Sequence, residues 1–84
     1  MTKETDQKLT LYIGASCGYC HKVMHFLSNN DIDIPIVDVW SDKAAFEEMK
    51  KLSGSTQVPC LKIDDTYMLE SDDIIDQLAE WFIA

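Results

Sequence analysis

Long apolar runs and basic residues are scarce in this sequence. No apolar stretch approaches the roughly 20 residues that cross a bilayer as a helix, which argues against a membrane-spanning protein. Only 7 lysine and arginine residues stand against 15 aspartate and glutamate residues, for a net charge of −8. Such a charge repels nucleic acid and anionic membrane surfaces. We therefore expect neither nucleic acid nor a membrane among the partners of this chain.

The first eight residues also lack the apolar segment of a secretory signal. Residues 1–8 are polar and predict a short solvated lead-in. Without an export signal, three cysteines indicate working thiols in the reducing cytoplasm rather than a structural disulfide framework. The chain has no repeat, linker or low-complexity segment, so residues 1–84 predict a single domain.

Two of the cysteines stand close together, in the string Cys17-Gly18-Tyr19-Cys20. The string follows an apolar run over residues 9–13 and opens a stretch of helical pattern, so it falls at a helix N-terminus. That end of a helix carries partial positive charge and unpaired N–H groups, and both favour a thiolate. The thiolate is the nucleophile of disulfide exchange, so the pair predicts a redox-active disulfide.

Helical spacing assigns different roles to these two thiols. Counted from Cys20, apolar residues recur at i+3, i+4 and i+7, at Val23, Met24 and Leu27. This spacing puts Cys20 on the face that packs against a core. Cys17 precedes the first turn, where its sulfur can meet a partner. We expect Cys17 to attack a disulfide and Cys20 to resolve the resulting mixed disulfide.

The rest of the pattern alternates strands and helices. We expect strands over 9–13, 32–40, 58–63 and 67–69, and helices over 17–29, 42–52 and from residue 71 onward. The apolar density of residues 32–40, which end at Trp40, predicts a strand buried on both faces. Ser41 and Ser71 are expected to cap the second and third helices. The predicted order is β-α-β-α-β-β-α, an α/β fold.

These motifs resemble the glutaredoxins, small proteins of the thioredoxin fold. The resemblance is carried by the Cys17–Cys20 string, by Val58-Pro59, and by Ser71-Asp72-Asp73 at the start of the last helix. It implies a four-stranded mixed sheet flanked by three helices, with a cis Val58–Pro59 bond beside Cys17. It also implies a glutathione-dependent thiol–disulfide oxidoreductase that reduces protein disulfides or glutathione mixed disulfides. Its implied partners are glutathione, as co-substrate, and disulfide-containing or glutathionylated proteins.

The resemblance further implies a glutathione groove beside the dithiol. The backbone of Val58 would pair with the cysteine of glutathione in the manner of an added strand. Ser71 and Asp72 would hold the γ-glutamyl end, where a helix N-terminus suits the carboxylate. Tyr19 and Pro59 would line the groove.

Three positions depart from the usual glutaredoxin pattern. Gly18 replaces a proline, and Leu69-Glu70 replaces a pair of glycines. Leu69-Glu70-Ser71 is similar to the N-terminal domain of glutathione transferases, where Glu-Ser binds the γ-glutamyl group. Gly14 stands where glutaredoxins commonly have a lysine that favours the thiolate and meets the glycyl carboxylate. We accordingly expect Gly14→Lys to strengthen glutathione binding.

Other functions remain open at this stage. Among glutaredoxins, loss of the proline at Gly18 is associated with a [2Fe–2S] cluster, held by Cys17 of two chains and two glutathiones. A weakly catalytic thioredoxin-fold binding module is a further alternative. A zinc site within the chain would need Cys60, His21 or His25 to complete four ligands, so we expect no metal bound by one chain. We expect a monomer, with Cys60 either a buried core residue or a third redox-active thiol.

Overall fold

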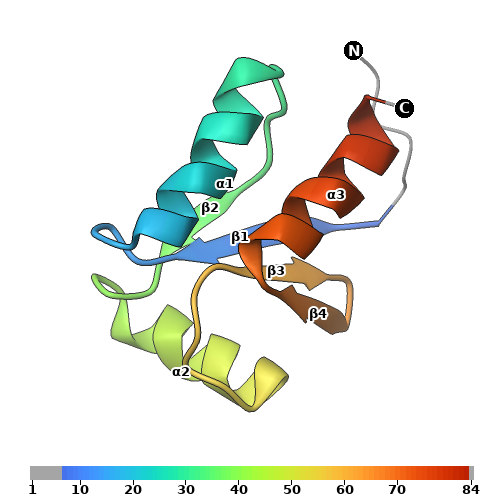
Figure 1. The fold of residues 1–84 in the computed structure, drawn as a ribbon. Helices are drawn as coiled ribbons and strands as arrows, with labels where there is room; N and C mark the ends of the chain where they lie inside the picture. Colours follow the sequence, from blue (N-terminus) through green and yellow to red (C-terminus); the bar gives the residue numbers. More distant parts are fainter. Residues whose placement is uncertain (1–6, 84) are drawn as a thin grey trace.

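The strands form a single mixed sheet with helices on both faces. The computed structural model describes residues 7–83. Its elements are β1 (Leu9–Ile13), α1 (Gly18–Asn29), β2 (Ile36–Asp38), α2 (Lys43–Ser53), β3 (Cys60–Ile63), β4 (Thr66–Leu69) and α3 (Ser71–Phe82). The sheet order is β2-β1-β3-β4, with β2 parallel to β1 and the other neighbours antiparallel. Figure 1 shows α1 and α3 on one side of the sheet and α2 on the other. The predicted α/β architecture and element order are confirmed.

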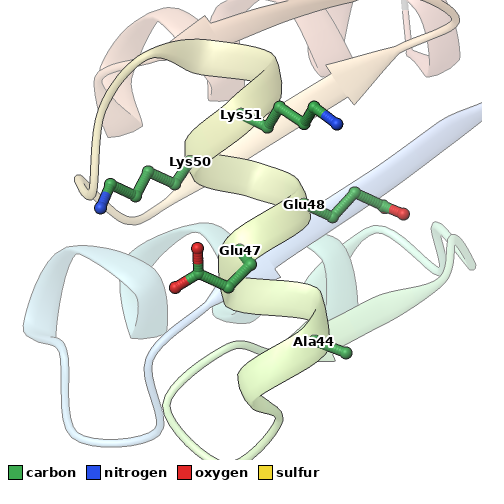
Figure 2. Close-up of a pocket in the computed structure, with 5 residues that line it drawn as sticks. All are labelled: Ala44, Glu47, Glu48, Lys50 and Lys51. Carbon is green, nitrogen blue, oxygen red and sulfur yellow. The ribbon is translucent and has the colours of Figure 1, made fainter.

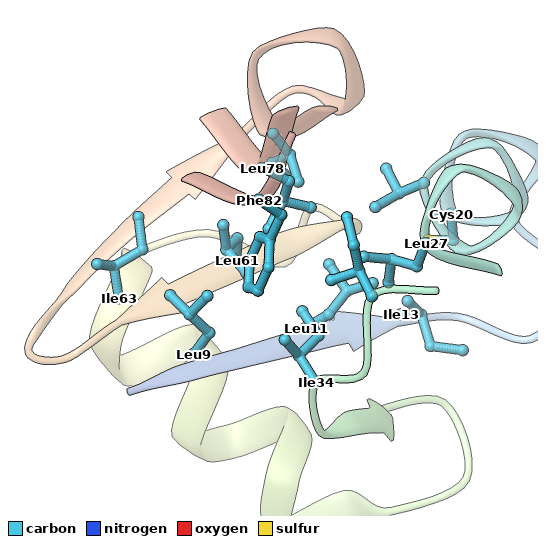
Figure 3. Close-up of a cluster of buried hydrophobic side chains, with 13 residues drawn as sticks. Leu9, Leu11, Ile13, Cys20, Leu27, Ile34, Leu61, Ile63, Leu78 and Phe82 are labelled. Atoms are coloured by element: carbon cyan, nitrogen blue, oxygen red, sulfur yellow. The ribbon is translucent and has the colours of Figure 1, made fainter. Parts of the chain in front are cut away.

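Alternation along β1 and β3 builds a core on each face of the sheet. Leu9, Leu11 and Ile13 point toward α1 and α3 and join the larger cluster of buried side chains (Figure 3). Tyr12 and Cys60 lie opposite each other on neighbouring strands and face the other way. They join the smaller cluster, which includes Met49 and Val39. The dithiol helix is thus fixed to the sheet by the larger core.

The strand predicted over residues 32–40 is wrong in its extent. Only Ile36–Asp38 pairs with β1. Ile32 and Ile34 are buried in the larger core, although their backbone is not part of a strand. Trp40 is 53% exposed. Pro35 has no N–H for a ladder, so the apolar run combines core-filling loop residues with a short strand.

The predicted cap of α2 is also wrong. Asp42, not Ser41, is the N-cap, and its carboxylate accepts the Ala45 N–H at 3.1 Å. The Ser41 hydroxyl instead donates to Asp38 Oδ2 at 2.9 Å. Two neighbouring residues compete here for the same capping position, and the one that is not used stabilises the turn after β2.

The predicted lead-in lies mostly outside the described residues, which begin at residue 7. Its last residue, Lys8, is bonded to the turn after β3. The Lys8 N–H donates to Asp64 Oδ1 at 3.0 Å, and the Asp64 N–H donates to the Lys8 carbonyl at 2.9 Å. Across residues 7–83, no helix is long and apolar enough to cross a bilayer.

Candidate active site

The first helix begins at the dithiol. Cys17 is the N-cap of α1, and its Sγ accepts the Cys20 N–H at 3.3 Å. A sulfur atom thus fills the place that a serine or aspartate oxygen usually takes. Both cysteines are free thiols, Cys17 partly exposed and Cys20 fully buried. The prediction that Cys20 faces the core is confirmed.

The thiol of Cys17 lies against a distant segment of the chain. Its Sγ–H donates to the carbonyl oxygen of Val58 at 3.8 Å, across 41 positions of sequence. Val58 is followed by a cis bond to Pro59, as the resemblance implied. The sulfur therefore sits between the N-terminus of α1 and the backbone that leads into β3.

Burial sets the acidity of the second thiol. The pKa of Cys20 is raised to about 12, mainly by burial, and the Cys17 thiol and Asp38 carboxylate contribute to this rise. The Gly14 N–H donates to Cys20 Sγ at 3.4 Å, and this hydrogen bond lowers the pKa of Cys20. Cys20 is therefore a neutral thiol at pH 7 in the reduced protein.

Gly14 has no space for a side chain. A Cβ atom at Gly14 would lie 2.3 Å from Cε2 of Trp40 and 2.4 Å from Cδ2, far inside van der Waals contact. A lysine at position 14 would have to displace this half-exposed indole, and the expected gain in glutathione binding for Gly14→Lys stays a prediction. Sequence reasoning missed Trp40, which was read as part of a buried strand. One signal was available, because the carboxyl ends of parallel neighbours such as β1 and β2 meet at one edge of the sheet.

A pocket of about 350 Å³ opens beside the dithiol loop. It is lined by Tyr19, Gln57, Val58, Pro59, Glu70, Ser71 and Asp72. Every residue predicted for the groove lies in this lining, contributed by α1, the segment before β3, and the start of α3. Sequence reasoning missed Gln57, whose amide Nε2 donates to Glu70 Oε1 at 3.2 Å. The pocket is partly apolar and partly polar, as a small-molecule site requires.

The start of α3 differs from the prediction. Ser71 is buried within the first turn, and Glu70 occupies the N-cap position without a side-chain cap. Glu70 has a φ of 75°, in the left-handed region that favours glycine. The acidic first-turn residues Asp72 and Asp73 interact favourably with the helix dipole instead.

Asp72 already has a partner. Lys22 of α1 forms an ion pair with its carboxylate, and both side chains are largely exposed. An exposed pair of this kind contributes about 0–1 kcal/mol, so a ligand can compete with it. The sequence pattern gave no reason to connect these residues, which lie 50 positions apart.

The remaining candidate residues lie in the core on the other face of the sheet or on the surface. Cys60 is fully buried in the smaller core, as expected if it is a core residue rather than a third redox-active thiol. Burial raises its pKa to about 11. His25 is exposed, and Nε2 of the exposed His21 ring lies 2.6 Å from the Ala15 carbonyl, to which it donates. Within residues 7–83, no group of three His, Cys, Asp or Glu side chains is arranged to hold a metal.

A second hollow, of about 680 Å³, runs along α2 (Figure 2). Its lining comes entirely from that helix: Ala44, Glu47, Glu48, Lys50 and Lys51. Glu47 and Lys50 project to one side of the helix and Glu48 and Lys51 to the other (Figure 2). Among residues 7–83, no thiol and no other element lines this hollow, so the pocket beside the dithiol is the candidate site.

Comparison with known proteins identifies the family. The glutaredoxin family model matches residues 9–68. The chain belongs to the glutaredoxin family. Glutaredoxin 3 of Escherichia coli K12 is 33% identical over 64 residues, which cover 76% of this chain and 77% of that protein. Membership of the glutaredoxins supports a glutathione-related thiol oxidoreductase.

Solved structures agree with this assignment. The thioredoxin-like protein BC3987 superimposes with a TM-score of 0.72 at 26% identity, covering 84% of this chain and 99% of that one. Isozyme E7 of Drosophila melanogaster glutathione S-transferase gives a TM-score of 0.74 at 26% identity, over 90% of this chain and 35% of that one. The fold of this glutaredoxin is therefore the thioredoxin fold.

Proposed function

We propose that this glutaredoxin-family chain is a glutathione-dependent thiol–disulfide oxidoreductase with Cys17 as nucleophile and Cys20 as resolving thiol. The observation that carries the proposal is the position of the Cys17 thiol. It is partly exposed, lies at the N-terminus of α1 and contacts Val58, which also lines the pocket. A substrate sulfur at the mouth of the pocket would meet Cys17 before any other thiol.

The reaction is a series of thiol–disulfide exchanges. The Cys17 thiolate attacks one sulfur of a disulfide, a Cys17–substrate disulfide forms, and the other sulfur leaves as a thiolate that takes a proton. A glutathione thiolate then attacks a glutathione mixed disulfide, releasing Cys17 and oxidised glutathione. For a protein substrate, Cys20 attacks Cys17 instead, and two glutathione molecules later reduce the Cys17–Cys20 disulfide.

The pocket suits glutathione at three points. The Val58 backbone can pair with the glutathione cysteine, and Tyr19 and Pro59 flank it. At the other end, the N-terminus of α3 suits the γ-glutamyl carboxylate, next to Ser71. Asp72 would receive the γ-glutamyl amine by exchanging it for Lys22. The predicted cytoplasmic location belongs to this proposal, because that compartment supplies reduced glutathione.

A turnover assay with a glutathione mixed disulfide tests the function. We expect reduction when glutathione and glutathione reductase supply electrons, and little when thioredoxin reductase replaces them. Cys17→Ser should abolish turnover, and the folded Cys60→Ala variant should retain it, because Cys60 is buried on the other face of the sheet. Wild-type protein that gives no turnover with either reductant would support the binding-module alternative.

A further inference from the structure

The backbone of Gly14 touches both cysteines. Its N–H donates to Cys20 Sγ at 3.4 Å, and its carbonyl oxygen accepts the Cys17 N–H at 3.0 Å. Gly14 directly follows β1, at the start of the loop that leads into α1. The orientation of this peptide segment therefore affects the relative position of the two sulfur atoms.

The indole of Trp40 packs on this segment. Three of its ring atoms lie 2.3 to 2.6 Å from the place of a Gly14 Cβ, so the ring is in van der Waals contact with the Gly14 backbone. The other part of the ring faces solvent, since Trp40 is 53% exposed. About half of the Trp40 side chain stays in water, so core burial holds this ring less firmly than it would hold a fully buried tryptophan.

The turn after β2 holds Trp40 in this position. Asp38 Oδ1 accepts the Trp40 N–H at 3.0 Å, and Oδ2 accepts the Ser41 hydroxyl at 2.9 Å. The Val39 N–H donates to the Ile13 carbonyl at 2.9 Å, which connects this turn to the end of β1. Trp40 and Gly14 are thus both fixed at the same edge of the sheet.

We propose that Trp40 is a positioning residue for the resolving step. Its indole packs against the Gly14 backbone and keeps the Gly14 N–H directed at Cys20 Sγ. The inference rests on the proposed function. In the resolving step, Cys20 loses its proton and its thiolate attacks Cys17 Sγ. The Cys17–Cys20 bond forms, the Cys17–substrate bond breaks, and the substrate thiolate takes a proton. The Gly14 N–H stabilises the negative charge that Cys20 must carry to attack.

Loss of Trp40 should affect the two reactions differently, because only the reduction of protein disulfides uses Cys20 as a nucleophile. Burial opposes the Cys20 thiolate, and Cys17 and Asp38 are the titratable groups that add to this opposition. The Gly14 hydrogen bond acts against them. Loss of Trp40 should therefore slow reduction of protein disulfides and leave deglutathionylation by free glutathione unchanged.

The test compares Trp40→Ala, Trp40→Phe and Tyr67→Ala in both assays. Tyr67 is the matched control, an exposed aromatic on β4. For Trp40→Ala we expect reduction of protein disulfides to fall about fivefold, the effect of one hydrogen bond, and its pH profile to move to higher pH. Trp40→Phe should restore both the rate and the profile, and Tyr67→Ala should change neither. Equal losses in both assays without a shift in pH, or no loss in either, would overturn the inference.

A second pair of variants moves the indole without removing it. Gly14→Ala places a methyl group against the ring, so alone it should act like Trp40→Ala. In the Trp40→Ala background the same methyl group meets no ring, and Gly14→Ala should add no further loss. Additive losses of the two substitutions would contradict the proposed contact.

The inference is also tested without turnover, which separates its failure from failure of the proposed function. In the Cys17→Ser background, alkylation of Cys20 is followed against pH by mass spectrometry, with and without Trp40→Ala. We expect Trp40→Ala to move the midpoint to higher pH, because the Gly14 N–H lowers the pKa of Cys20. Identical midpoints would exclude the positioning role, whatever the enzyme assays show.

Discussion

At the scale of single residues, the two thiols differ more than their proximity in sequence suggests. Cys17 is partly exposed and contacts Val58, whereas Cys20 is buried and bonded to Gly14. Helical spacing was sufficient to predict this difference, because the inward face of a helix follows from its period. The contact of Gly14 with Trp40 was missed, because its one signal in the sequence is that both residues follow parallel neighbouring strands.

The first residue-scale prediction concerns the division of roles between the thiols. Cys17→Ser should abolish both deglutathionylation and reduction of protein disulfides. Cys20→Ser should keep deglutathionylation, because glutathione itself can resolve that mixed disulfide, but should lose most reduction of protein disulfides. Parallel assays with a glutathionylated peptide and a disulfide-bonded protein measure this. Faster alkylation of Cys20 than of Cys17 in the reduced wild type would contradict the assignment.

The second residue-scale prediction concerns the ion pair at the pocket. Lys22→Gln leaves Asp72 free to accept the amine of the γ-glutamyl group, so the KM for a glutathione mixed disulfide should fall by about twofold, with kcat little changed. The matched control is Lys43→Gln, which removes the same charge from α2. An equal fall in KM for both variants would point to net charge rather than to the ion pair. A rise in KM for Lys22→Gln alone would show that Lys22 itself binds the substrate.

At the scale of elements, the fold was easier to predict from sequence than its boundaries were. The spacing of apolar residues predicts the alternation of strands and helices, and all seven predicted elements are present in the structure. The extent of β2 was predicted wrongly, because Ile32 and Ile34 fill the core from a loop and the interruption that Pro35 signals was not used. The groove residues were predictable only through family motifs, since the tertiary fold is what places Val58 and Asp72 in one pocket with Tyr19.

The start of α3 supports an element-scale prediction. Glu70 holds a left-handed backbone conformation that costs a residue with a Cβ on the order of 1 kcal/mol. Glu70→Gly should therefore increase the free energy of unfolding by up to about 1 kcal/mol, measured by urea denaturation. Glu70→Ala is the control, because it removes the carboxylate and its bond to Gln57 but keeps the strained conformation. A gain in stability with alanine as well would assign the effect to the carboxylate.

At the scale of the whole molecule, two neutral thiols are built into the two cores. Cys20 lies in the larger core and Cys60 in the smaller, with pKa values of about 12 and about 11 against an ordinary value of 9.0. A raised pKa in the folded state means that the unfolded chain loses these protons first. The contribution of these two thiols to stability is therefore fully present below pH 9.0 and is lost as pH rises toward those values.

This linkage predicts a measurable alkaline instability. Under reducing conditions, the free energy of unfolding should fall above pH 9.0 by up to about 1.4 kcal/mol per pH unit for each buried thiol. Urea denaturation across this range measures the slope. Cys60→Ala should give a shallower slope because one of the two thiols is removed. The same slope in that variant would show that other groups, such as the buried Tyr12 phenol with its raised pKa, are responsible.

The net charge of the whole chain also bears on the iron–sulfur alternative. A bridging cluster requires two chains of net charge −8 to approach closely, which their mutual repulsion opposes. We expect the protein to remain colourless and monomeric after anaerobic incubation with iron, sulfide and glutathione, followed by size exclusion. A brown dimer that Gly18→Pro abolishes would establish the carrier function instead. Gly18 has open space around the position of a Cβ, so this substitution meets no steric obstacle there.

Because the Cys17 sulfur caps α1, the stability of this helix and the reduction potential of the dithiol depend on each other. Cys17 Sγ accepts the N–H of Cys20 in the reduced protein, and that atom becomes half of a covalent bond when the dithiol is oxidised. Because the redox cycle is closed, any free energy that the cap contributes to the reduced helix also makes the disulfide a stronger oxidant by the same amount. Substitutions that weaken the first turn of α1 should then change the reduction potential of the dithiol, even where they contact neither thiol.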